Sequence, residues 1–465
     1  MASAKRARVE AAQATELNLA RLRDSLATGR FVHPTEDGIL NFADLAQALA
    51  KCCGLAPARP VRTELADKLA EDIGGSSRQH VVVVLCDGMG VDLLARHGCG
   101  FLGAAPRRPL RAVFPATTPA ALTTLATATW PGQHGMPGWE LRDLKACEFP
   151  KEGMDPVQLT VLDSVVRDMR TKKPAAELGF SKKDIYIDEP WIARGASSRR
   201  MKFINAYTGT EFTDWFEGEH AKNAMTIEET AQETLGTPEG SGQAVKFFNE
   251  GVDCILESVK EADEKRWKSY VYMYTAHPDK HMHDLGTDHP EVVKVCRGIN
   301  DALERLWVKL KRFDVTMIVT ADHGHVTVNP EEMVTLPDPL LDCLEYANVG
   351  VHGKGRHGYF HCRSGRHEEF QAAWEAEPML REHFILLPVD VAVQEGLFGP
   401  DAPVPAARPR LGDFLSISLG AHTLVSPNEL TYKTECKCQG AHGSLTPTEM
   451  NIPLLIFKGE SAQAV

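Results

Sequence analysis

The sequence contains no apolar run long enough to cross a membrane, since a spanning helix needs about 18 or more apolar residues in succession. The N-terminus is charged at once and lacks the apolar segment of a secretory signal. Basic residues are outnumbered: 51 Lys and Arg against 63 Asp and Glu give a net charge of −12. An acidic surface repels the nucleic-acid backbone. These absences predict neither a membrane span nor a nucleic-acid partner.

Cysteine is present, but its spacing does not suit disulfides. The chain has 11 cysteines, an odd number. Cys52 and Cys53 are adjacent, and a single residue separates Cys436 from Cys438. No second cysteine pair lies near Cys436 and Cys438 in the sequence to complete a soft-metal site. The pattern indicates a reducing compartment, and we expect a cytoplasmic protein.

Three short apolar runs are predicted to be strands, at residues 81–86, 269–274 and 315–320. Runs this apolar are typical of parallel strands that are buried on both faces of a sheet. Amphipathic segments from about 242 to 265 and from about 290 to 312 precede the second and third runs. This alternation predicts an α/β fold with a central, mostly parallel sheet and helices on both faces.

The rest of the chain gives an outline of its organisation. Residues 1–36 are polar and helical in pattern, without a clear docking face, and we interpret them as an N-terminal extension. Asn41 is a favourable N-cap residue and predicts an amphipathic helix that runs to about Leu55. Residues 37–465 are expected to form one domain. The stretch 180–240 is polar, shows no clear strand and is interpreted as a cap-like insertion.

A carboxylate follows each of the three predicted strands. Asp87 comes directly after the first strand, and Asp279 follows the second after a short turn. Asp322 comes just after the third. Ligands bind at the carboxyl ends of the strands in open α/β sheets. Three acids at one edge would repel one another strongly unless cations lay between them, so the sequence predicts bound cations there.

Histidines accompany these acids at spacings that suit metal ligation. His283 lies four residues after Asp279, so that one turn could present both to the same ion. His323 directly follows Asp322, and His442 lies next to glycines that allow a close backbone approach. A mixed carboxylate and imidazole set suits zinc, manganese or iron better than calcium or magnesium. We expect divalent ions, zinc first, with manganese and iron as alternatives.

Other histidines lie close to these positions or cluster elsewhere. A single histidine is more often a hydrogen-bonded structural residue than a metal ligand. We interpret His277, His281 and His325, which flank the predicted ligands, as exposed or supporting residues. The cluster of His352, His357 and His361 lies on a predicted strand–loop–strand, and we do not expect it to bind a metal.

A threonine at the start of a predicted helix is the candidate nucleophile. Pro119 suits the first helical position and places Thr118 at the N-cap. A hydroxyl there faces the unpaired amides and the positive end of the helix dipole, which favours a phosphoryl group. Threonine becomes a good nucleophile only when activated, for example by a metal. Spacing does not separate Thr118 from Thr117, and an ordinary helix cap is the alternative to catalysis.

Five motifs occur in a fixed order along the chain. They are Asp87-Gly88-Met89-Gly90, Phe114-Pro115 through His134-Gly135, Pro278-Asp279-x-x-x-His283, Ala321-Asp322-His323-Gly324 and Gly440-Ala441-His442-Gly443-Ser444. Together they resemble the type I phosphodiesterase/nucleotide pyrophosphatase family of the alkaline-phosphatase superfamily. The resemblance spans most of the chain. It implies an alkaline-phosphatase-like three-layer sandwich and two divalent metal ions.

The resemblance also implies a role for each site residue. For one ion the implied ligands are Asp87, Asp322 and His323, with the oxygen of Thr118 completing the set. For the other ion they are Asp279, His283 and His442. The family pattern matches without a gap from Phe114 to Gly135, and it implies that Thr118, rather than Thr117, is the nucleophile.

The implied function is metal-dependent cleavage of a phosphodiester or pyrophosphate bond in a small phosphate ester, through a phospho-threonine intermediate. The chain departs from the family at Pro119 and Ala121, where nucleotide pyrophosphatases usually have an aromatic residue and an asparagine. The missing asparagine argues against a nucleotide substrate. A phosphomonoesterase and a phosphonate hydrolase are alternatives, and a non-catalytic metal-binding protein is a remoter one. No feature of the sequence indicates the oligomeric state.

Overall fold

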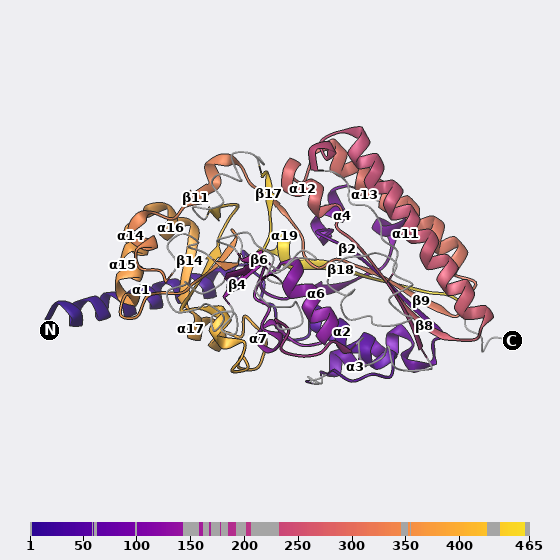
Figure 1. The fold of residues 1–465 in the computed structure, drawn as a ribbon, viewed down its shortest axis with the longest axis horizontal. Helices are drawn as coiled ribbons and strands as arrows, with labels where there is room; N and C mark the ends of the chain where they lie inside the picture. The colour runs from indigo at the N-terminus through magenta and orange to yellow at the C-terminus, as the bar shows by residue number, and fades with distance from the viewer. Residues whose placement is uncertain are drawn as a thin grey trace.

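A seven-stranded sheet runs through the centre of the structure, a computed structural model (Figure 1). The structure describes residues 2–57, 59, 63–97, 100–142, 158–160, 167–168, 177, 185–191, 201–205, 232–345, 352–353, 355–425 and 438–460. In spatial order the strands are β1 (Leu40–Asn41), β3 (Arg107–Arg111), β18 (Asn451–Lys458), β9 (Val315–Thr320), β2 (His80–Cys86), β8 (Lys268–Thr275) and β7 (Met201–Asn205). Neighbours are parallel except at β18, which is antiparallel to both β3 and β9. The predicted central, mostly parallel sheet is confirmed.

Helices cover both faces of this sheet, which completes the predicted three layers (Figure 1). The long helices α11 (Pro238–Glu264) and α13 (Pro290–Leu310) pack together on one face. On the other face lie α2 (Phe42–Cys52), α3 (Glu64–Ile73) and α6 (Thr118–Thr127). All seven residues of β2 are buried, as expected for a strand covered on both sides.

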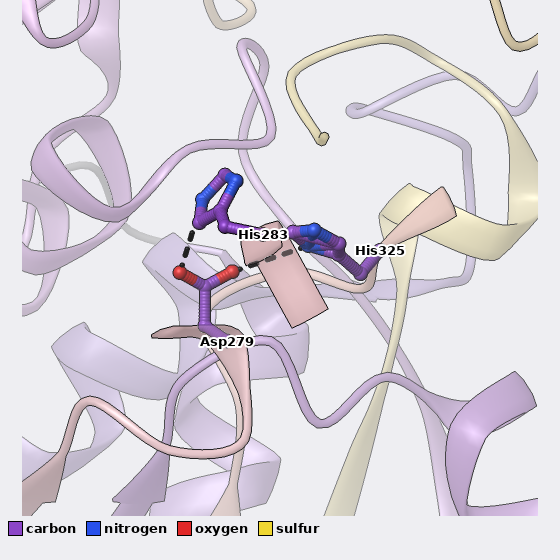
Figure 2. A group of neighbouring side chains, drawn as sticks. All are labelled: Asp279, His283 and His325. Atoms are coloured by element: carbon purple, nitrogen blue, oxygen red, sulfur yellow. Dashed lines mark ion pairs between the residues drawn. The ribbon is translucent and has the colours of Figure 1, made fainter. Parts of the chain in front are cut away.

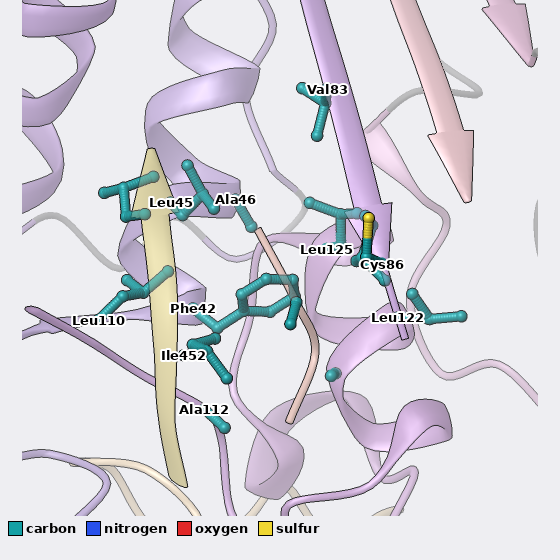
Figure 3. Packing of buried hydrophobic residues seen from close by; sticks show 14 of the residues in the cluster. Phe42, Leu45, Ala46, Val83, Cys86, Leu110, Ala112, Leu122, Leu125 and Ile452 are labelled. Atoms are coloured by element: carbon teal, nitrogen blue, oxygen red, sulfur yellow. The ribbon is translucent and has the colours of Figure 1, made fainter. Parts of the chain in front are cut away.

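A hydrophobic core joins α2 and α6 to the sheet. Phe42 of α2, Leu125 of α6 and Cys86 of β2 belong to this core (Figure 3). The Asn41 side chain accepts a hydrogen bond from the Ala43 amide (2.8 Å) and caps α2, as predicted. The helix ends at Cys52, before the expected end near Leu55. This packing holds the start of α6 close to the carboxyl end of β2.

Part of the stretch 180–240 belongs to the central sheet. Residues Met201–Asn205 form β7, which pairs in parallel with β8 at the edge of the sheet. The expectation of no strand in this stretch is therefore wrong at these residues, because pairing with β8, and not the local sequence pattern, decides their conformation. Most of the remaining stretch lies outside the described residues, so its cap-like role stays a prediction.

A smaller antiparallel sheet forms between β9 and β18 in the sequence. Its strands, in spatial order, are β12 (His352–Gly353), β13 (His357–Phe360), β15 (Phe414–Ser418) and β14 (Phe384–Pro388). The helices α14 (Asp338–Leu341), α15 (His367–Ala376) and α16 (Pro378–His383) accompany it. The smaller sheet and these helices share a second hydrophobic core, in which Phe360, Phe370 and Trp374 are fully buried.

The N-terminal helix α1 (Ala2–Ala27) packs against α15 and β14. Leu22 is fully buried, and the Arg21 guanidinium donates to the backbone carbonyls of Arg381 (2.7 Å) and Phe384 (3.0 Å). The expectation that this segment lacks a docking face is therefore wrong. Leu19 and Leu26, one helical turn on either side of Leu22, also pack against the main hydrophobic core, so α1 docks through an apolar stripe together with the Arg21 contacts. In the part of the chain that is described, no helix is both long and apolar enough to span a membrane.

Candidate active site

Three carboxylates meet at the carboxyl-terminal edge of the central sheet. β2 and β9 pair in parallel with Leu85 beside Thr320, so two residues later Asp87 and Asp322 come level. Asp279 begins the short helix α12 (Asp279–Leu285) after β8, and its amide donates to the Asp87 carbonyl (3.1 Å). The arrangement expected from the three strand ends is therefore present.

Each carboxylate has a buried oxygen without a hydrogen-bond partner in the described part of the chain. These atoms are Oδ1 of Asp87, Oδ1 of Asp279 and Oδ2 of Asp322. Burial raises the pKa of Asp87 well above its usual value, and the negative charges of Asp322 and Asp279 raise it further. Buried polar atoms are normally satisfied, so three unmatched oxygens at one point fit a site that holds cations.

The three predicted histidine ligands are oriented in the same way. The Nδ1 atoms of His283, His323 and His442 hydrogen-bond to the carbonyls of Gly440 (2.9 Å), Gly324 (2.9 Å) and Ala116 (2.8 Å), respectively. A carbonyl only accepts, so Nδ1 carries a proton and the neutral ring keeps a lone pair on Nε2. Metal-bound histidines typically have this arrangement. The three rings fit the role of metal ligands.

Nε2 of each ring faces the carboxylates. The His323 Nε2 lies 3.3 Å from Oδ1 of Asp87 and 3.3 Å from Oδ2 of Asp322. The His283 Nε2 lies 3.2 Å from Oδ2 of Asp279. Burial by itself lowers the pKa of His283, but the Asp279 carboxylate outweighs this effect and raises it well above its usual value. The same negative charge of Asp279 would attract a divalent ion to this position.

Among the described residues, the side chains that could hold metal ions form three overlapping groups, in each of which the ligand atoms lie within 4.8 Å of one another. The groups are Asp87 with Asp322 and His323, Asp279 with His323 and His442, and Asp279 with His283 and His325. The first is the set implied for one ion. The set implied for the other ion is divided between the second and third groups, which share Asp279, and the Nε2 of His442 lies 3.9 Å from Oδ1 of Asp279. The rings of His323 and His442 are stacked, with centroids 3.6 Å apart.

His325 is therefore a residue that the sequence interpretation undervalued. Its side chain is 1% exposed, which rules out an exposed residue and leaves the alternative of a supporting one. Its Nδ1 lies 3.2 Å from Oδ1 of Asp279, and Figure 2 shows Asp279 between His283 and His325. Neither His357 nor His361 belongs to a group that could hold a metal among the described residues, and the side chain of His352 lies outside them.

Thr118 lies against the first group of ligands. Its Oγ1 is 3.1 Å from Nε2 of His323 and 3.4 Å from Oδ2 of Asp87. Helix α6 begins at Thr118, one residue earlier than predicted, and Thr117 is its N-cap. The Thr117 hydroxyl is buried and has no hydrogen-bond partner in the described structure. Of the two threonines, Thr118 is thus the one whose hydroxyl contacts the predicted ligands.

Neighbouring groups orient the acids. The Tyr274 hydroxyl, at the end of β8, donates to Oδ2 of Asp87. Oδ1 of Asp322 accepts the backbone amides of Gly88 (3.1 Å) and His323 (3.0 Å). From the sequence, Tyr274 is predicted as the last residue of a buried strand and not as a site residue. Its position at the carboxyl end of that strand is the one sequence feature that indicates a role at the site.

The family profile of type I phosphodiesterase/nucleotide pyrophosphatase matches residues 81–445. The chain belongs to this family. Members of the type I phosphodiesterase/nucleotide pyrophosphatase family hydrolyse phosphoric esters, so the predicted family and enzyme class are both confirmed. No curated protein matches the chain in sequence.

Solved structures share the fold of this family member at low sequence identity. Murine ectonucleotide pyrophosphatase/phosphodiesterase 5, as an inactive variant in complex with AMP, has a TM-score of 0.52 and 15% identity, covering 81% of this chain and 87% of its own. Phosphonoacetate hydrolase from Sinorhizobium meliloti 1021, in complex with phosphonoformate, has a TM-score of 0.53 and 16% identity, covering 83% and 91%. These structural similarities confirm the alkaline-phosphatase-like fold that was predicted for this protein.

Proposed function

We propose that the protein is a metal-dependent hydrolase that cleaves a phosphodiester or pyrophosphate bond in a small phosphate ester, through a phospho-threonine at Thr118. The observation that carries the proposal is the position of the Thr118 hydroxyl, 3.1 Å from Nε2 of His323 and at the N-terminus of α6. Thr118 is 1% exposed, and electrostatic interactions are stronger at a site withdrawn from water.

Two divalent ions would be held by the acids and histidines of the site, and zinc suits this mixed set best, with manganese and iron as alternatives. The residues that would hold them are Asp87, Asp279, His283, Asp322, His323 and His442, with the oxygen of Thr118. When bound, such ions lower the pKa of a hydroxyl and neutralise charge on a phosphoryl group.

The chain's own groups account for the course of the reaction. The Oγ1 of Thr118 gives up its proton to water and attacks phosphorus, while the bond from phosphorus to the leaving oxygen breaks and that oxygen departs with the electron pair. The N-terminus of α6 favours the negative phosphoryl group beside Thr118. Water then cleaves the bond between phosphorus and Oγ1, which releases phosphate or a phosphate monoester and restores the hydroxyl.

Changing Thr118 tests the nucleophile directly. In T118A, hydrolysis of bis-p-nitrophenyl phosphate should fall to the background rate while the metal content stays that of the wild type. In T118S a hydroxyl remains, and measurable activity should remain with it. Treatment of the wild type with a chelator should abolish activity, and added zinc should restore it. Full activity of T118A would refute the nucleophile, and activity that survives complete metal removal would refute the metal dependence.

A phosphonate hydrolase is a second candidate, favoured by one specific position. Ala121 is fully buried in the first turns of α6, where nucleotide-cleaving relatives carry an asparagine that donates to the phosphoryl group. A panel of a dinucleotide, a phosphodiester, a phosphomonoester and a phosphonate would rank the substrates. Turnover of the phosphonate alone would replace the first proposal by the second, and preference for the monoester would indicate a phosphomonoesterase. A metal-bound protein that turns over none of them would be the non-catalytic alternative.

Two further assignments belong to this proposal. The spacing of the 11 cysteines supports a reducing compartment, and we place the protein in the cytoplasm on that ground. We also propose that the stretch 180–240, apart from β7, shapes the choice of substrate as a cap on a catalytic domain spanning residues 37–465.

A further inference from the structure

We propose that His325 is itself a ligand of the metal ion that Asp279 and His283 would hold. The inference rests on the proposed function only in requiring that a divalent ion binds beside Asp279. It adds a third imidazole to a site for which the family resemblance implies two.

The pairing of two short strands places His325 at the site. β10 (Val326–Thr327) pairs antiparallel with β17 (Gly440–Ala441), with Val326 opposite Ala441. The residue before Val326 therefore comes level with the residue after Ala441, which puts His325 beside His442. Their ring centroids are 5.4 Å apart.

Asp279 and His283 surround the same point as His325. The Nδ1 of His325 lies 3.2 Å from Oδ1 of Asp279, and the rings of His283 and His325 have centroids 4.6 Å apart (Figure 2). The ligand atoms of the three residues lie within 4.8 Å of one another. One ion could therefore reach all three.

Neither ring nitrogen of His325 has a hydrogen-bond partner among the residues that the structure describes, although the side chain is 1% exposed. The Nδ1 is close to Oδ1 of Asp279 but is not aligned for a hydrogen bond with it, as expected when two ligand atoms face a common point instead of each other. A buried imidazole without a partner is costly, and an ion would remove that cost. The site also makes room for the ring, since a Cβ on Gly440 would lie 2.6 Å from its Nε2.

A third imidazole would make the two metal positions chemically different. Asp279 would share its ion with imidazoles, whereas Asp87 and Asp322 supply two carboxylates and His323 one imidazole. Imidazole-rich sites favour zinc and similar ions, and carboxylate-rich sites accept manganese and magnesium more readily. We therefore expect the ion at Asp279 to be the more tightly held of the two and the more selective for zinc.

The test combines a zinc-loaded crystal structure with a metal-affinity measurement. Anomalous scattering at the zinc edge should place Nδ1 of His325 about 2.0–2.1 Å from the ion at Asp279, the usual distance for a zinc–imidazole bond. In H325Q, competition with a chromophoric chelator should show one of the two zinc ions bound at least about tenfold more weakly, with the other unchanged. H80Q is the matched control, because His80 is equally buried but begins β2 at the end of the strand opposite Asp87.

Each outcome separates this inference from the proposed function. Two zinc ions bound with Nδ1 of His325 more than about 3 Å from both would overturn the inference and leave the proposed function standing. Unchanged affinity for both ions in a folded H325Q would do the same. A wild-type protein that binds no divalent ion would overturn the proposed function. If H325Q fails to fold, the wild-type zinc distance alone decides the matter.

Discussion

Arg356 and Glu449 form a two-pronged ion pair in the interior of the protein. The Arg356 Nε and Nη2 donate to the two carboxylate oxygens of Glu449, each over 2.7 Å, and both side chains are fully buried. Arg356 lies just before β13 of the smaller sheet, and Glu449 belongs to α19 (Pro447–Met450), just before β18 of the central sheet. The Glu449 carbonyl also accepts the Gly324 amide (2.7 Å), next to His323. The pair thus ties the smaller sheet to the central sheet beside the candidate site.

Breaking this pair should destabilise the protein strongly. R356M leaves the Glu449 carboxylate buried without its partner, which typically costs about 3–5 kcal/mol. Urea unfolding followed by tryptophan fluorescence would measure the loss. The double variant R356M/E449Q removes both charges and should recover part of the stability. A loss in R356M no larger than that of the double variant would contradict this account.

The same pair should make stability depend on acid. Burial by itself raises the pKa of Glu449, but Arg356 outweighs this and lowers the pKa below its usual 4.5. A carboxyl whose pKa is lower in the folded protein stabilises fully above its unfolded pKa, and this stabilisation is lost as the pH falls through the folded value. The difference in unfolding free energy between wild type and E449Q should therefore be constant from pH 7 to about 5 and shrink below pH 4.5. A difference that grows on acidification would show that Glu449 is not held ionised by Arg356.

The sequence allowed the central sheet and the meeting of its three strand-end acids to be predicted for a simple physical reason. Strands β2, β8 and β9 are apolar on both faces, and parallel strands end at one edge, so Asp87, Asp279 and Asp322 could be expected together. The contribution of His325 could not be predicted in this way, because it depends on the register of β10 and β17. These strands are two residues long and carry no periodic pattern.

The elements that sequence interpretation missed are those decided by contacts distant in sequence. Residues 201–205 form the strand β7 because they pair in parallel with β8. Helix α1 docks because Leu22 packs into the main core and Arg21 donates to carbonyls at the end of α16. Neither partner can be read from the local sequence of the segment itself.

Repulsion among the acids should give D322N opposite effects with and without metal. In the metal-free protein, replacing the Asp322 carboxylate by an amide removes one of three clustered acidic groups. The free energy of unfolding of D322N should therefore exceed that of the wild type by roughly 1–3 kcal/mol. The Oδ1 of the asparagine can still accept the amides of Gly88 and His323. With zinc the order should reverse, because the wild type gains binding free energy that D322N has largely lost. Thermal unfolding in chelator and in zinc would measure both, and a D322N less stable than wild type in chelator would contradict the prediction.

Tyr274 should act on the metal through Asp87. Y274F removes the hydroxyl that donates to Oδ2 of Asp87 and leaves that carboxylate less firmly oriented. Loss of such an orienting hydrogen bond typically lowers metal affinity about 10–100-fold, and a chelator competition titration would detect it in one of the two ions. Y272F is the matched control, two residues earlier on the same strand and face. Equal effects of Y272F and Y274F would indicate a general packing defect instead.

The docking of α1 depends on Arg21, and a neighbour on the same helix provides the control. The Arg21 guanidinium donates to the carbonyls of Arg381 (2.7 Å), Glu382 (2.8 Å) and Phe384 (3.0 Å) at the end of α16. R21M leaves these carbonyls to water and should lower the unfolding free energy by about 1–3 kcal/mol.

Arg23 instead pairs with Glu395 at the surface, with its side chain 63% exposed, so R23M should change stability little. Hydrogen exchange gives the more local measurement: in R21M, amides of α1 and of residues 381–386 should exchange faster together, whereas in R23M they should not. If R21M and R23M accelerate exchange in α1 equally, the positive charge on the helix, and not the carbonyl contacts of Arg21, stabilises its docking.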